Sequence, residues 1–392
     1  MKTLKRTWAD ISLDHLEYNY RSIRAHLPQG TKFLGVMKAD AYGHGAVPVS
    51  RALADLGAEY LAVSNLEEAV QIRRGEVRLP ILILGYTPAE YAANMIFLDI
   101  TQEVHSLEYA RELNEALAGT NYILNVHLKL DTGMTRIGFF AYDDERTLDE
   151  LRQVAQLPHL HIEGVFMHFC VADSRAEADV SFTKLQYKRF MDMLSAMAGV
   201  GIRPEIRHCC NSGATILYPE FALDMVRPGI ITYGNAPSDE LEGALSLRPM
   251  MSLHSMIAQV RTVPAGTDIS YGRLYRTKEE TRVAVLPIGY ADGLSRLLTG
   301  KASFYLQGKQ VPVIGRICMD MCMIDVSDVP EAKPGDVVTI FGYDDDGTLL
   351  PCERLARAQG TINYELLCQI SKRIPRICHR GAETSQILQY IV

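Results

Sequence analysis

The sequence predicts an α/β protein in which a (β/α)8 TIM barrel is followed by a mostly antiparallel β domain. Between Phe33 and Ile230, eight short apolar or β-branched runs occur, and helix-like stretches separate most of them. This alternation indicates a parallel sheet covered by helices, and eight repeats in this length fit a closed barrel better than an open sheet. After Gly234 the expected strands follow one another without long helices, which favours antiparallel β structure.

The expected barrel strands are the runs at 33–38, 60–65, 80–86, 98–104, 123–132, 162–168, 205–211 and 225–230. Two of the stretches between them, 47–57 and 66–75, have apolar residues at helical spacing. The fourth run is the least regular, because Asp99, Gln102 and Glu103 interrupt its apolar pattern.

A polar segment at 235–244 is typical of a linker, so we expect a barrel domain at 1–240 and a mostly β domain at 241–392. Turn residues separate the later runs, notably at Pro264, Gly308-Lys309 and Pro334. The expected strands of this domain are 256–263, 281–289, 302–317 (with the turn at Gly308-Lys309), 321–328 and 336–342, and two short helices follow near 353–359 and 364–372.

Composition excludes several classes of protein. A formal net charge of −7 does not favour binding to nucleic acid or to an anionic membrane. The N-terminal residues contain no apolar core of a secretory signal, and no later apolar run is long enough to span a bilayer. Eight scattered cysteines do not resemble a disulfide framework, and Cys318 and Cys322 lack a second ligand pair for zinc. We therefore expect a cytosolic protein without a metal site.

Polar residues collect at the carboxyl ends of the expected barrel strands, the face where barrel enzymes place their chemistry. The loops after strands seven and eight of such barrels commonly hold a phosphate, and Ser212, Gly213 and Gly229 offer a hydroxyl and open backbone amides for one. Tyr42 could add a phenolic donor. The full set is Lys38, Lys129, Asp131, Arg136, His168, Asn211, Ser212, Gly213, Arg227 and Gly229.

Each of these residues also has an ordinary interpretation. A lysine at a strand end is usually a solvated surface residue, His168 alone would be a barrel histidine, and Arg227 alone would be an ion-pair partner. Their coincidence on one face raises the odds of a site. A lysine without acidic or metal-ligand companions favours Schiff-base chemistry with an aldehyde, and the phosphate loops favour a phosphate-bearing aldehyde cofactor.

Several motifs resemble those of bacterial alanine racemases, a fold-type III family of pyridoxal-phosphate enzymes. VMKADAYGHG at 36–45 resembles the cofactor-lysine motif of that family, although Asp40 stands where Asn is common. The resemblance extends from about Trp8 to about Arg376, nearly the whole chain. The other matching motifs are HLKLDTGMTRIG at 127–138, NS at 211–212, DMVRPGI at 224–230, ISYG at 269–272, IGYADG at 288–293, GRICMD at 315–320 and GTINYE at 360–365.

The resemblance implies a role for each matching residue. Lys38 would hold pyridoxal 5′-phosphate covalently and act as one catalytic base, and Tyr271 of the partner subunit would act as the second. Arg227 would face the pyridine nitrogen, supported by His168. The residues implied for the cofactor phosphate and its surroundings are Tyr42, Asn211, Ser212, Gly229, Ile230 and Tyr364.

The substrate side of the site is implied in the same way. Arg136 would reach the phenolic oxygen of the cofactor and the substrate, helped by Lys129, which is carbamylated in many relatives. Met319 would bind the substrate carboxylate through its backbone amide, and Tyr290 would narrow the entry. Both would come from the partner of a homodimer with shared active sites.

The expected function is interconversion of L-alanine and D-alanine, which supplies D-alanine for peptidoglycan. Serine or broad-spectrum racemisation is the first alternative. A fold-type III decarboxylase would place a carboxylate where Arg227 stands. A non-catalytic pyridoxal-phosphate carrier would resemble the barrel alone, and this chain also has the motifs of a second domain.

Overall fold

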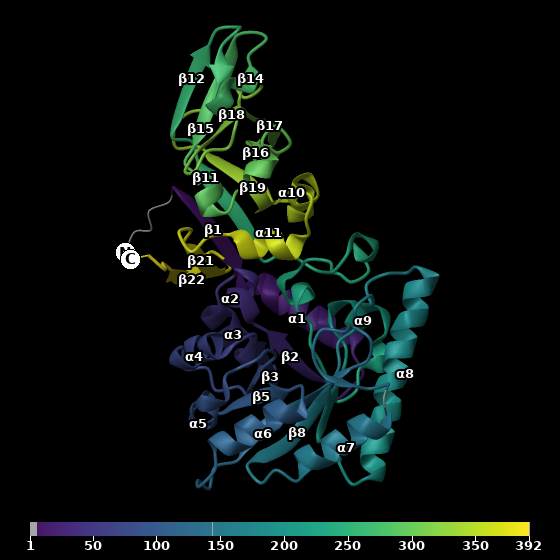
Figure 1. Cartoon of the computed structure of the whole chain (residues 1–392). Coiled ribbons are helices and arrows are strands. Elements are labelled where there is room, and N and C mark those ends of the chain that lie inside the picture. Colours follow the sequence, from purple (N-terminus) through teal and green to yellow (C-terminus); the bar gives the residue numbers. More distant parts are fainter. Residues whose placement is uncertain (1–5, 143, 392) are drawn as a thin grey trace. The chain divides into compact units, whose positions relative to one another are not determined.

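The computed structural model describes residues 6–142 and 144–391, and the chain divides into two compact units. The barrel unit comprises Leu16–Ala41 and Ala46–Arg248. The sheet unit comprises, of the described residues, 6–15, 42–45 and 249–391. The division therefore differs from the expected segments 1–240 and 241–392 mainly at the start of the chain, where the first strand belongs to the sheet unit (Figure 1).

The barrel unit contains the expected closed barrel of parallel strands. The strand order is β5-β4-β3-β2-β10-β9-β8-β6, and pairing of β5 with β6 closes it. The strands are β2 (Lys32–Val36), β3 (Tyr60–Val63), β4 (Ile81–Ile83), β5 (Ile100–Val104), β6 (Leu124–Asp131), β8 (Leu160–Phe166), β9 (Ile206–His208) and β10 (Met225–Val226). The predicted fold class is confirmed.

Seven of these strands end one to four residues earlier than the sequence pattern suggests. The expected runs included polar residues such as Lys38, His168 and Asn211, which follow β2, β8 and β9 rather than lie in them. These side chains therefore lie just beyond the carboxyl ends of the strands, the position from which barrel enzymes use them.

Strand β5 forms despite its polar sequence, and hydrogen bonds satisfy part of its buried polar groups; among the described residues, Oε1 of Gln102 and Oε2 of Glu103 have no partner. The Gln102 side-chain amide donates to the carbonyl oxygens of Gly85 and Glu103, at 2.8 Å each. A carboxylate oxygen of Glu103 is 2.9 Å from Nδ1 of His105. The interruption in the fourth expected run thus marks a polar barrel strand, and the strand itself is present.

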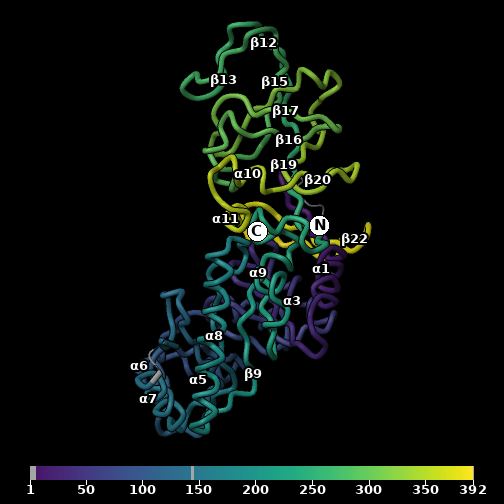
Figure 2. The backbone as a smooth tube through the Cα atoms, turned by 90° about the vertical axis from the view of Figure 1, so that its right-hand side faces the viewer, coloured from purple at the N-terminus to yellow at the C-terminus, as the bar shows by residue number. Residues whose placement is uncertain are grey.

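Helices surround the barrel, and several begin at side-chain caps. Asn65 and Ser106 accept hydrogen bonds from the backbone N–H groups of Glu68 and Tyr109, which satisfies donors that a helix start leaves open. Figure 2 shows α5 to α8 on one side of the unit. The helices are α1 (Leu13–His26), α3 (Ala46–Asp55), α4 (Leu66–Arg74), α5 (Ala92–Phe97), α6 (Leu107–Ala116), α7 (Asp144–Ala155), α8 (Glu177–Gly199) and α9 (Ser212–Leu217), with short 3-10 turns η1 (Ala89–Tyr91), η2 (Pro219–Phe221), η3 (Ile230–Tyr233) and η4 (Asp239–Leu241).

The sheet unit is built on one large, mostly antiparallel sheet, as expected. Its order is β12-β15-β18-β17-β16-β19-β11-β1-β21-β22, with β20 on β19, and a separate pair β13-β14. Two helices, α10 (Cys352–Gln359) and α11 (Asn363–Gln369), match the predicted short helices. The strands are β1 (Thr7–Ser12), β11 (Met251–Met256), β12 (Gln259–Val263), β13 (Asp268–Ile269), β14 (Tyr275–Arg276), β15 (Thr281–Leu286), β16 (Ser303–Leu306), β17 (Lys309–Ile314), β18 (Cys322–Asp325), β19 (Val337–Tyr343), β20 (Leu349–Leu350), β21 (Arg376–Arg380) and β22 (Glu383–Leu388).

Two details of this sheet differ from the sequence interpretation. The turn between β16 and β17 consists of Gln307 and Gly308, both with positive φ, rather than Gly308 and Lys309. A two-residue turn with positive φ at both positions matches the right-handed twist of a hairpin. Strand β1 pairs antiparallel with β11 and parallel with β21, so it completes the sheet from the start of the chain.

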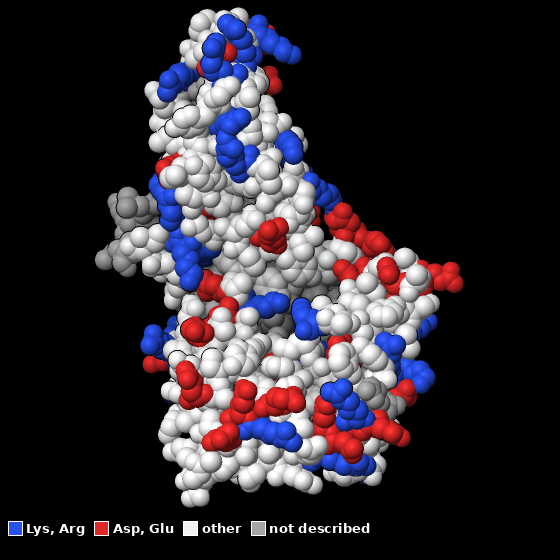
Figure 3. Space-filling model, viewed as in Figure 1, with Lys and Arg blue, Asp and Glu red and all other residues white. Residues whose placement is uncertain are grey.

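The surface agrees with the mixed charge of the composition. On the face of the barrel unit seen in Figure 3, acidic and basic side chains are interspersed. No helix within residues 6–142 and 144–391 is both long and apolar enough to cross a membrane.

Candidate active site

The carboxyl end of the barrel holds a buried arginine among neutral acceptors. Arg227 follows β10, and its guanidinium donates to Nδ1 of His208 at 3.0 Å and to the carbonyl oxygens of Met167 at 2.7 Å and Cys209 at 3.1 Å. A further contact of 3.3 Å reaches Nδ1 of His168. Burial lowers the pKa of Arg227 to about 10, so the group keeps its charge at neutral pH.

Lys129 is a second buried cationic residue of this cluster. Its Nζ donates to the carbonyl oxygen of Leu130 at 2.8 Å. Both this Nζ and the Arg227 guanidinium lie over the ring of Phe166. Burial, followed by the charge of Arg227, lowers the pKa of Lys129 to about 7. The same two effects hold the pKa of His168 well below its ordinary value. At neutral pH, His168 is uncharged and a large fraction of Lys129 is an uncharged amine.

Four of the six residues expected around the cofactor phosphate lie together after β9 and β10. Asn211 caps α9 by accepting from the backbone N–H of Ala214 at 3.0 Å, and Ser212 is the first residue of that helix. The backbone N–H of Gly229 donates to Oγ of Ser212 at 2.9 Å, and Ile230 begins η3. Two helical turns therefore start side by side, with small residues at both starts.

Lys38 opens a left-handed helical turn. Ala39, Asp40, Ala41 and Tyr42 have φ between 51° and 56°, and α2 (Lys38–Tyr42) is formed by this turn. Left-handed helix costs about 1–2 kcal/mol for each residue with a Cβ, so the surrounding contacts must enforce it. Such enforced strain is concentrated at functional sites.

Two carboxylates hold this turn in place. One Glu68 oxygen accepts from the backbone N–H of Ala39 at 2.7 Å, and Asp40 accepts from the backbone N–H of Ala46 at 2.7 Å. An asparagine at position 40 could accept the same bond, so the departure from the family pattern preserves this contact. The Lys38 side chain is exposed at the head of the turn.

Arg136 lies in the loop between β6 and β7 (Phe139–Phe140), a short strand that the sequence pattern missed. The carboxylate of Asp131 organises this loop by accepting from the backbone N–H groups of Gly133 at 2.9 Å and Thr135 at 3.1 Å. Arg136 is exposed, and its charge contributes to the lowered pKa of Lys129.

The sheet unit brings the three expected partner-site residues together around one loop. The backbone N–H of Tyr290 donates to the carbonyl oxygen of Cys318 at 3.0 Å, next to Met319. Ser270, directly before Tyr271, donates from its hydroxyl to the carbonyl oxygen of Arg316 at 2.7 Å. Within the single chain Tyr271 is 72% exposed, Met319 53% and Tyr290 42%, so all three are available to another molecule.

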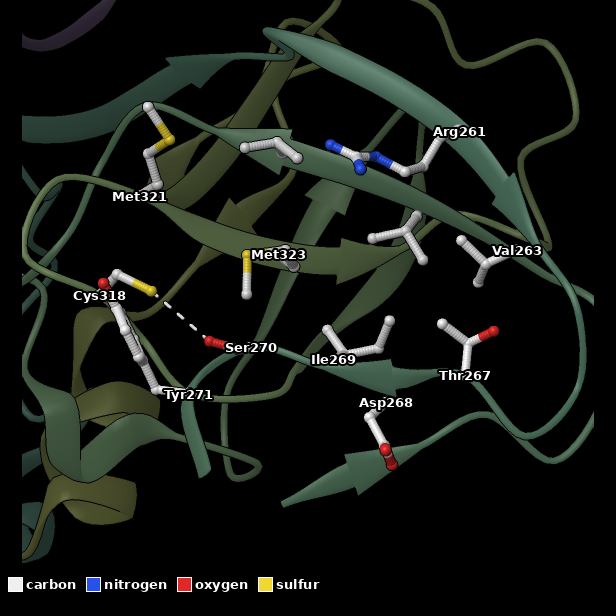
Figure 4. A pocket seen from close by; sticks show the side chains of 12 residues that line it. Arg261, Val263, Thr267, Asp268, Ile269, Ser270, Tyr271, Cys318, Met321 and Met323 are labelled. Carbon is white, nitrogen blue, oxygen red and sulfur yellow. Dashed lines mark hydrogen bonds between the residues drawn. The ribbon is translucent and has the colours of Figure 1, made fainter. Parts of the chain in front are cut away.

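Tyr271 lies in a strained turn at the edge of a pocket. Ser270, Gly272 and Arg273 all have positive φ, and Tyr271 stands between them in η5 (Tyr271–Arg273). The pocket has a volume of about 490 Å³ (Figure 4). Figure 4 shows Tyr271 and Cys318 at one end of it and Arg261 at the other.

Tyr42 and Tyr364, the other two residues expected near the cofactor phosphate, lie in the sheet unit as well. The rings of Tyr42 and Tyr364 have centroids 6.0 Å apart. The expected site residues are thus divided between the two units. The barrel group is Lys38, Lys129, Arg136, His168, Asn211, Ser212, Arg227, Gly229 and Ile230, and the sheet group is Tyr42, Tyr271, Tyr290, Met319 and Tyr364.

Sequence reasoning missed the polar interior of the barrel below Arg227. His127 and His208 lie within expected strands, and the sequence analysis assigned a role to neither. Nδ1 of His127 is 2.8 Å from Nε2 of His208, and Nε2 of His127 is 3.1 Å from a carboxylate oxygen of Glu163. The available signal was Gly164, a glycine inside a strand, which often marks a bulge or close packing.

Gly164 makes room for His127. A Cβ atom at position 164 would lie 2.5 Å from Cε1 of the His127 ring. We expect Gly164→Ala to lower the free energy of unfolding by about 1–3 kcal/mol, because the buried ring must shift. Urea denaturation of the purified variant measures this change.

Gly199→Ala is the matched control for that substitution. A Cβ at Gly199, the last residue of α8, meets nothing within 4 Å, so this variant should be as stable as the parent or up to about 1 kcal/mol more stable. Equal free energies of unfolding for the two variants would contradict the packing described at Gly164.

Comparisons with known proteins identify the family of this chain. The family model "Alanine racemase, N-terminal domain" matches residues 11–237, and "Alanine racemase, C-terminal domain" matches residues 250–378. The chain belongs to the alanine racemase family. Both parts of the chain match, so the enzyme class predicted from the sequence, a racemase, is confirmed.

Individual members of the alanine racemase family are similar over almost the full length. The alanine racemase of Desulfovibrio desulfuricans is 46% identical over 370 residues, which cover 94% of this chain and 97% of that protein. The solved alanine racemase of Clostridium difficile 630 has a TM-score of 0.93 at 39% identity and full coverage of both chains. That of Bacillus anthracis, solved with bound L-Ala-P, has a TM-score of 0.93 at 34% identity, covering 100% of this chain and 99% of that chain.

Proposed function

We propose that this chain is a pyridoxal 5′-phosphate-dependent racemase that interconverts L-alanine and D-alanine, with Lys38 and Tyr271 as its two bases. The observation that carries the cofactor assignment is the buried Arg227 at the carboxyl end of the barrel. The relative from Bacillus anthracis, solved with bound L-Ala-P, supports a ligand of the alanine class.

The donors around Arg227 fit a phosphorylated pyridine aldehyde. Among the described residues Arg227 has no carboxylate partner, and its Nε–H has no hydrogen-bond partner. A neutral ring nitrogen is a suitable acceptor for such a group. The Ser212 hydroxyl and the backbone at Gly229 offer small, polar surroundings for a phosphate. Asn211, Ile230, Tyr42 and Tyr364 are assigned to the cofactor site with them, and His168 supports Arg227.

When bound, pyridoxal phosphate withdraws electrons from a linked amino acid and so acidifies its α-proton. Lys38 is proposed to hold the cofactor and to remove or return that proton on one face of the α-carbon. Tyr271 of the partner subunit does the same on the opposite face, which inverts the configuration. Arg227, permanently charged, cannot accept a proton from the pyridine nitrogen.

The partner subunit is proposed to complete the site. The partner's Tyr271, the partner's Met319 and the partner's Tyr290 would line the substrate side opposite Arg136. The exposure of these residues in the single chain supports a homodimer with shared sites. The uncharged fraction of Lys129 is nucleophilic, which supports carbamylation of this residue. The proposal places the reaction in the cytosol, where D-alanine would supply peptidoglycan.

The direct test is to follow both enantiomers of alanine and of serine with the holoenzyme. We expect each alanine enantiomer to approach an equal mixture, with serine a poorer substrate. Faster inversion of serine than of alanine would overturn the substrate assignment, and no inversion of either amino acid would overturn the racemase assignment.

Arg227→Glu is expected to raise transamination relative to racemisation by at least about tenfold, since a carboxylate raises the proton affinity of the pyridine nitrogen. Formation of the pyridoxamine form, followed by its absorbance during incubation with alanine, measures this ratio. Arg227→Lys is the control that keeps a positive charge at this position. A glutamate variant that racemises normally without pyridoxamine would show that Arg227 does not face the ring.

A further inference from the structure

A chain of hydrogen bonds runs through the barrel interior from Arg227 to Glu163. The Arg227 guanidinium is 3.0 Å from Nδ1 of His208. Nε2 of His208 is 2.8 Å from Nδ1 of His127, and Nε2 of His127 is 3.1 Å from Glu163. Both histidines are fully buried. The proposed proton transfers use none of the groups beyond Arg227.

The donor at each step of this chain is determined by chemistry. Arginine can only donate, so Nδ1 of His208 must accept and its proton must be on Nε2. That N–H points to Nδ1 of His127, which must therefore also accept. The proton of His127 is then on Nε2, and it donates to the carboxylate of Glu163, which can only accept when ionised. The carboxylate oxygen is thus the final acceptor of a polarised chain.

The barrel is built around these groups. In the pairing of β6 with β8, Val126 is opposite Ile162 and His127 is opposite Gly164, so Glu163 is the extra residue of a β-bulge. A bulge redirects a side chain, and Gly164 leaves space for the His127 ring. The His208 ring stacks on Phe166, with centroids 4.9 Å apart and an interplanar angle of 12°.

Further hydrogen bonds fix the position of Glu163, the last group in this series of hydrogen bonds. The Glu163 oxygen that accepts from His127 also accepts from the hydroxyls of Tyr60 at 2.8 Å and Thr101 at 3.2 Å. Burial lowers the pKa values of His127 and His208, which favours the neutral rings that the donor pattern requires. Burial acts in the opposite direction on Glu163, but the hydrogen bonds from His127 and Tyr60 lower its pKa below the usual value.

We infer that Glu163 is a positioning residue for Arg227, which acts through His127 and His208 by fixing the tautomer of both imidazoles. The functional part of this inference rests on the proposed role of Arg227 at the pyridine nitrogen. If the acceptor at 163 is removed, the Nε2–H of His127 loses its partner. The tautomer with the proton on Nδ1, which would face the N–H of His208, then becomes less unfavourable relative to the native one. Two donors would oppose each other, and Arg227 would lose the acceptor that orients it.

Neutron diffraction of the holoenzyme tests the tautomers directly, because it locates the hydrogen atoms that X-ray structures leave to inference. We expect hydrogen on Nε2 and none on Nδ1 in both His127 and His208. Hydrogen on Nδ1 of either ring would overturn the inference. This result does not depend on any assay of activity, so it remains decisive if a variant fails to fold or if the proposed function is wrong.

Three variants test whether Glu163 affects the function of Arg227, measured as the ratio of transamination to racemisation. Glu163→Leu removes the acceptor, and we expect about a tenfold rise in the ratio of transamination to racemisation. Glu163→Gln keeps an oxygen acceptor, and its ratio should stay within about twofold of the parent value. Tyr60→Phe removes a different hydrogen bond from the same carboxylate and controls for general loss of packing.

A Glu163→Leu ratio equal to that of Tyr60→Phe would overturn the inference, as would a Glu163→Gln variant as impaired as Glu163→Leu. A parent enzyme that inverts neither alanine nor serine would instead reject the proposed function. The two failures are therefore distinguishable.

Discussion

Lys38→Ala is expected to lower the racemase turnover number by at least about 10⁴-fold, because it removes both a catalytic base and the covalent attachment of the cofactor. Lys38 begins the left-handed turn that ends at Tyr42, and Glu68 and Asp40 hold this turn in place. A substitution at the side chain leaves these backbone contacts intact, so the folded barrel should persist. Initial rates with both alanine enantiomers measure the loss.

Lys32→Ala is the matched control for this experiment. Lys32 begins β2, the strand that precedes Lys38, and it is exposed. It should keep the parent rate. Borohydride reduction of the parent holoenzyme followed by peptide mapping should find the cofactor on the peptide containing Lys38. Cofactor attached to any other lysine would reject the assignment.

The barrel could be predicted from sequence because parallel strands between helices leave a periodic pattern that is local in the chain. The same pattern placed Lys38, His168 and Arg227 at strand ends, since polar residues follow each apolar run. The exact strand ends were less predictable. The sequence does not distinguish a residue inside the hydrogen-bonded part of a strand from one just beyond its last hydrogen bond.

The contribution of the N-terminal segment to the sheet unit was not predictable in this way. Strand β1 pairs with Met251–Met256 and Arg376–Arg380, which lie far along the chain, and no local pattern specifies partners at that separation. Strand β22 has no buried residue and begins with four polar ones, so it lacks the apolar alternation that marks a strand.

Two features of the candidate site were hidden for different physical reasons. The turn at Ala39 to Tyr42 contains no glycine, so its residue types give no sign of a left-handed conformation. Glu163 reaches the barrel interior only because a bulge interrupts the pairing of β6 with β8. Sequence alternation assumes regular pairing and therefore cannot place a bulged side chain.

We propose that one active site takes Lys38 from one subunit and Tyr271 from the other. In this arrangement, Lys38→Ala and Tyr271→Ala homodimers should each be nearly inactive, because every site lacks one base. In a mixed dimer, one site receives both substitutions and the other receives none. Equal mixing with free subunit exchange should therefore restore about a quarter of the parent activity, since about half of the dimers are mixed and each has one intact site.

The measurement is the racemase rate of the exchanged mixture, with each homodimer alone as its baseline and native mass spectrometry as proof of exchange. Recovery to about a quarter of the parent rate is the result that the shared site predicts. A rate that stays at the baseline of the separate homodimers, although mixed dimers are present, would contradict it and show that each site is completed within a single chain.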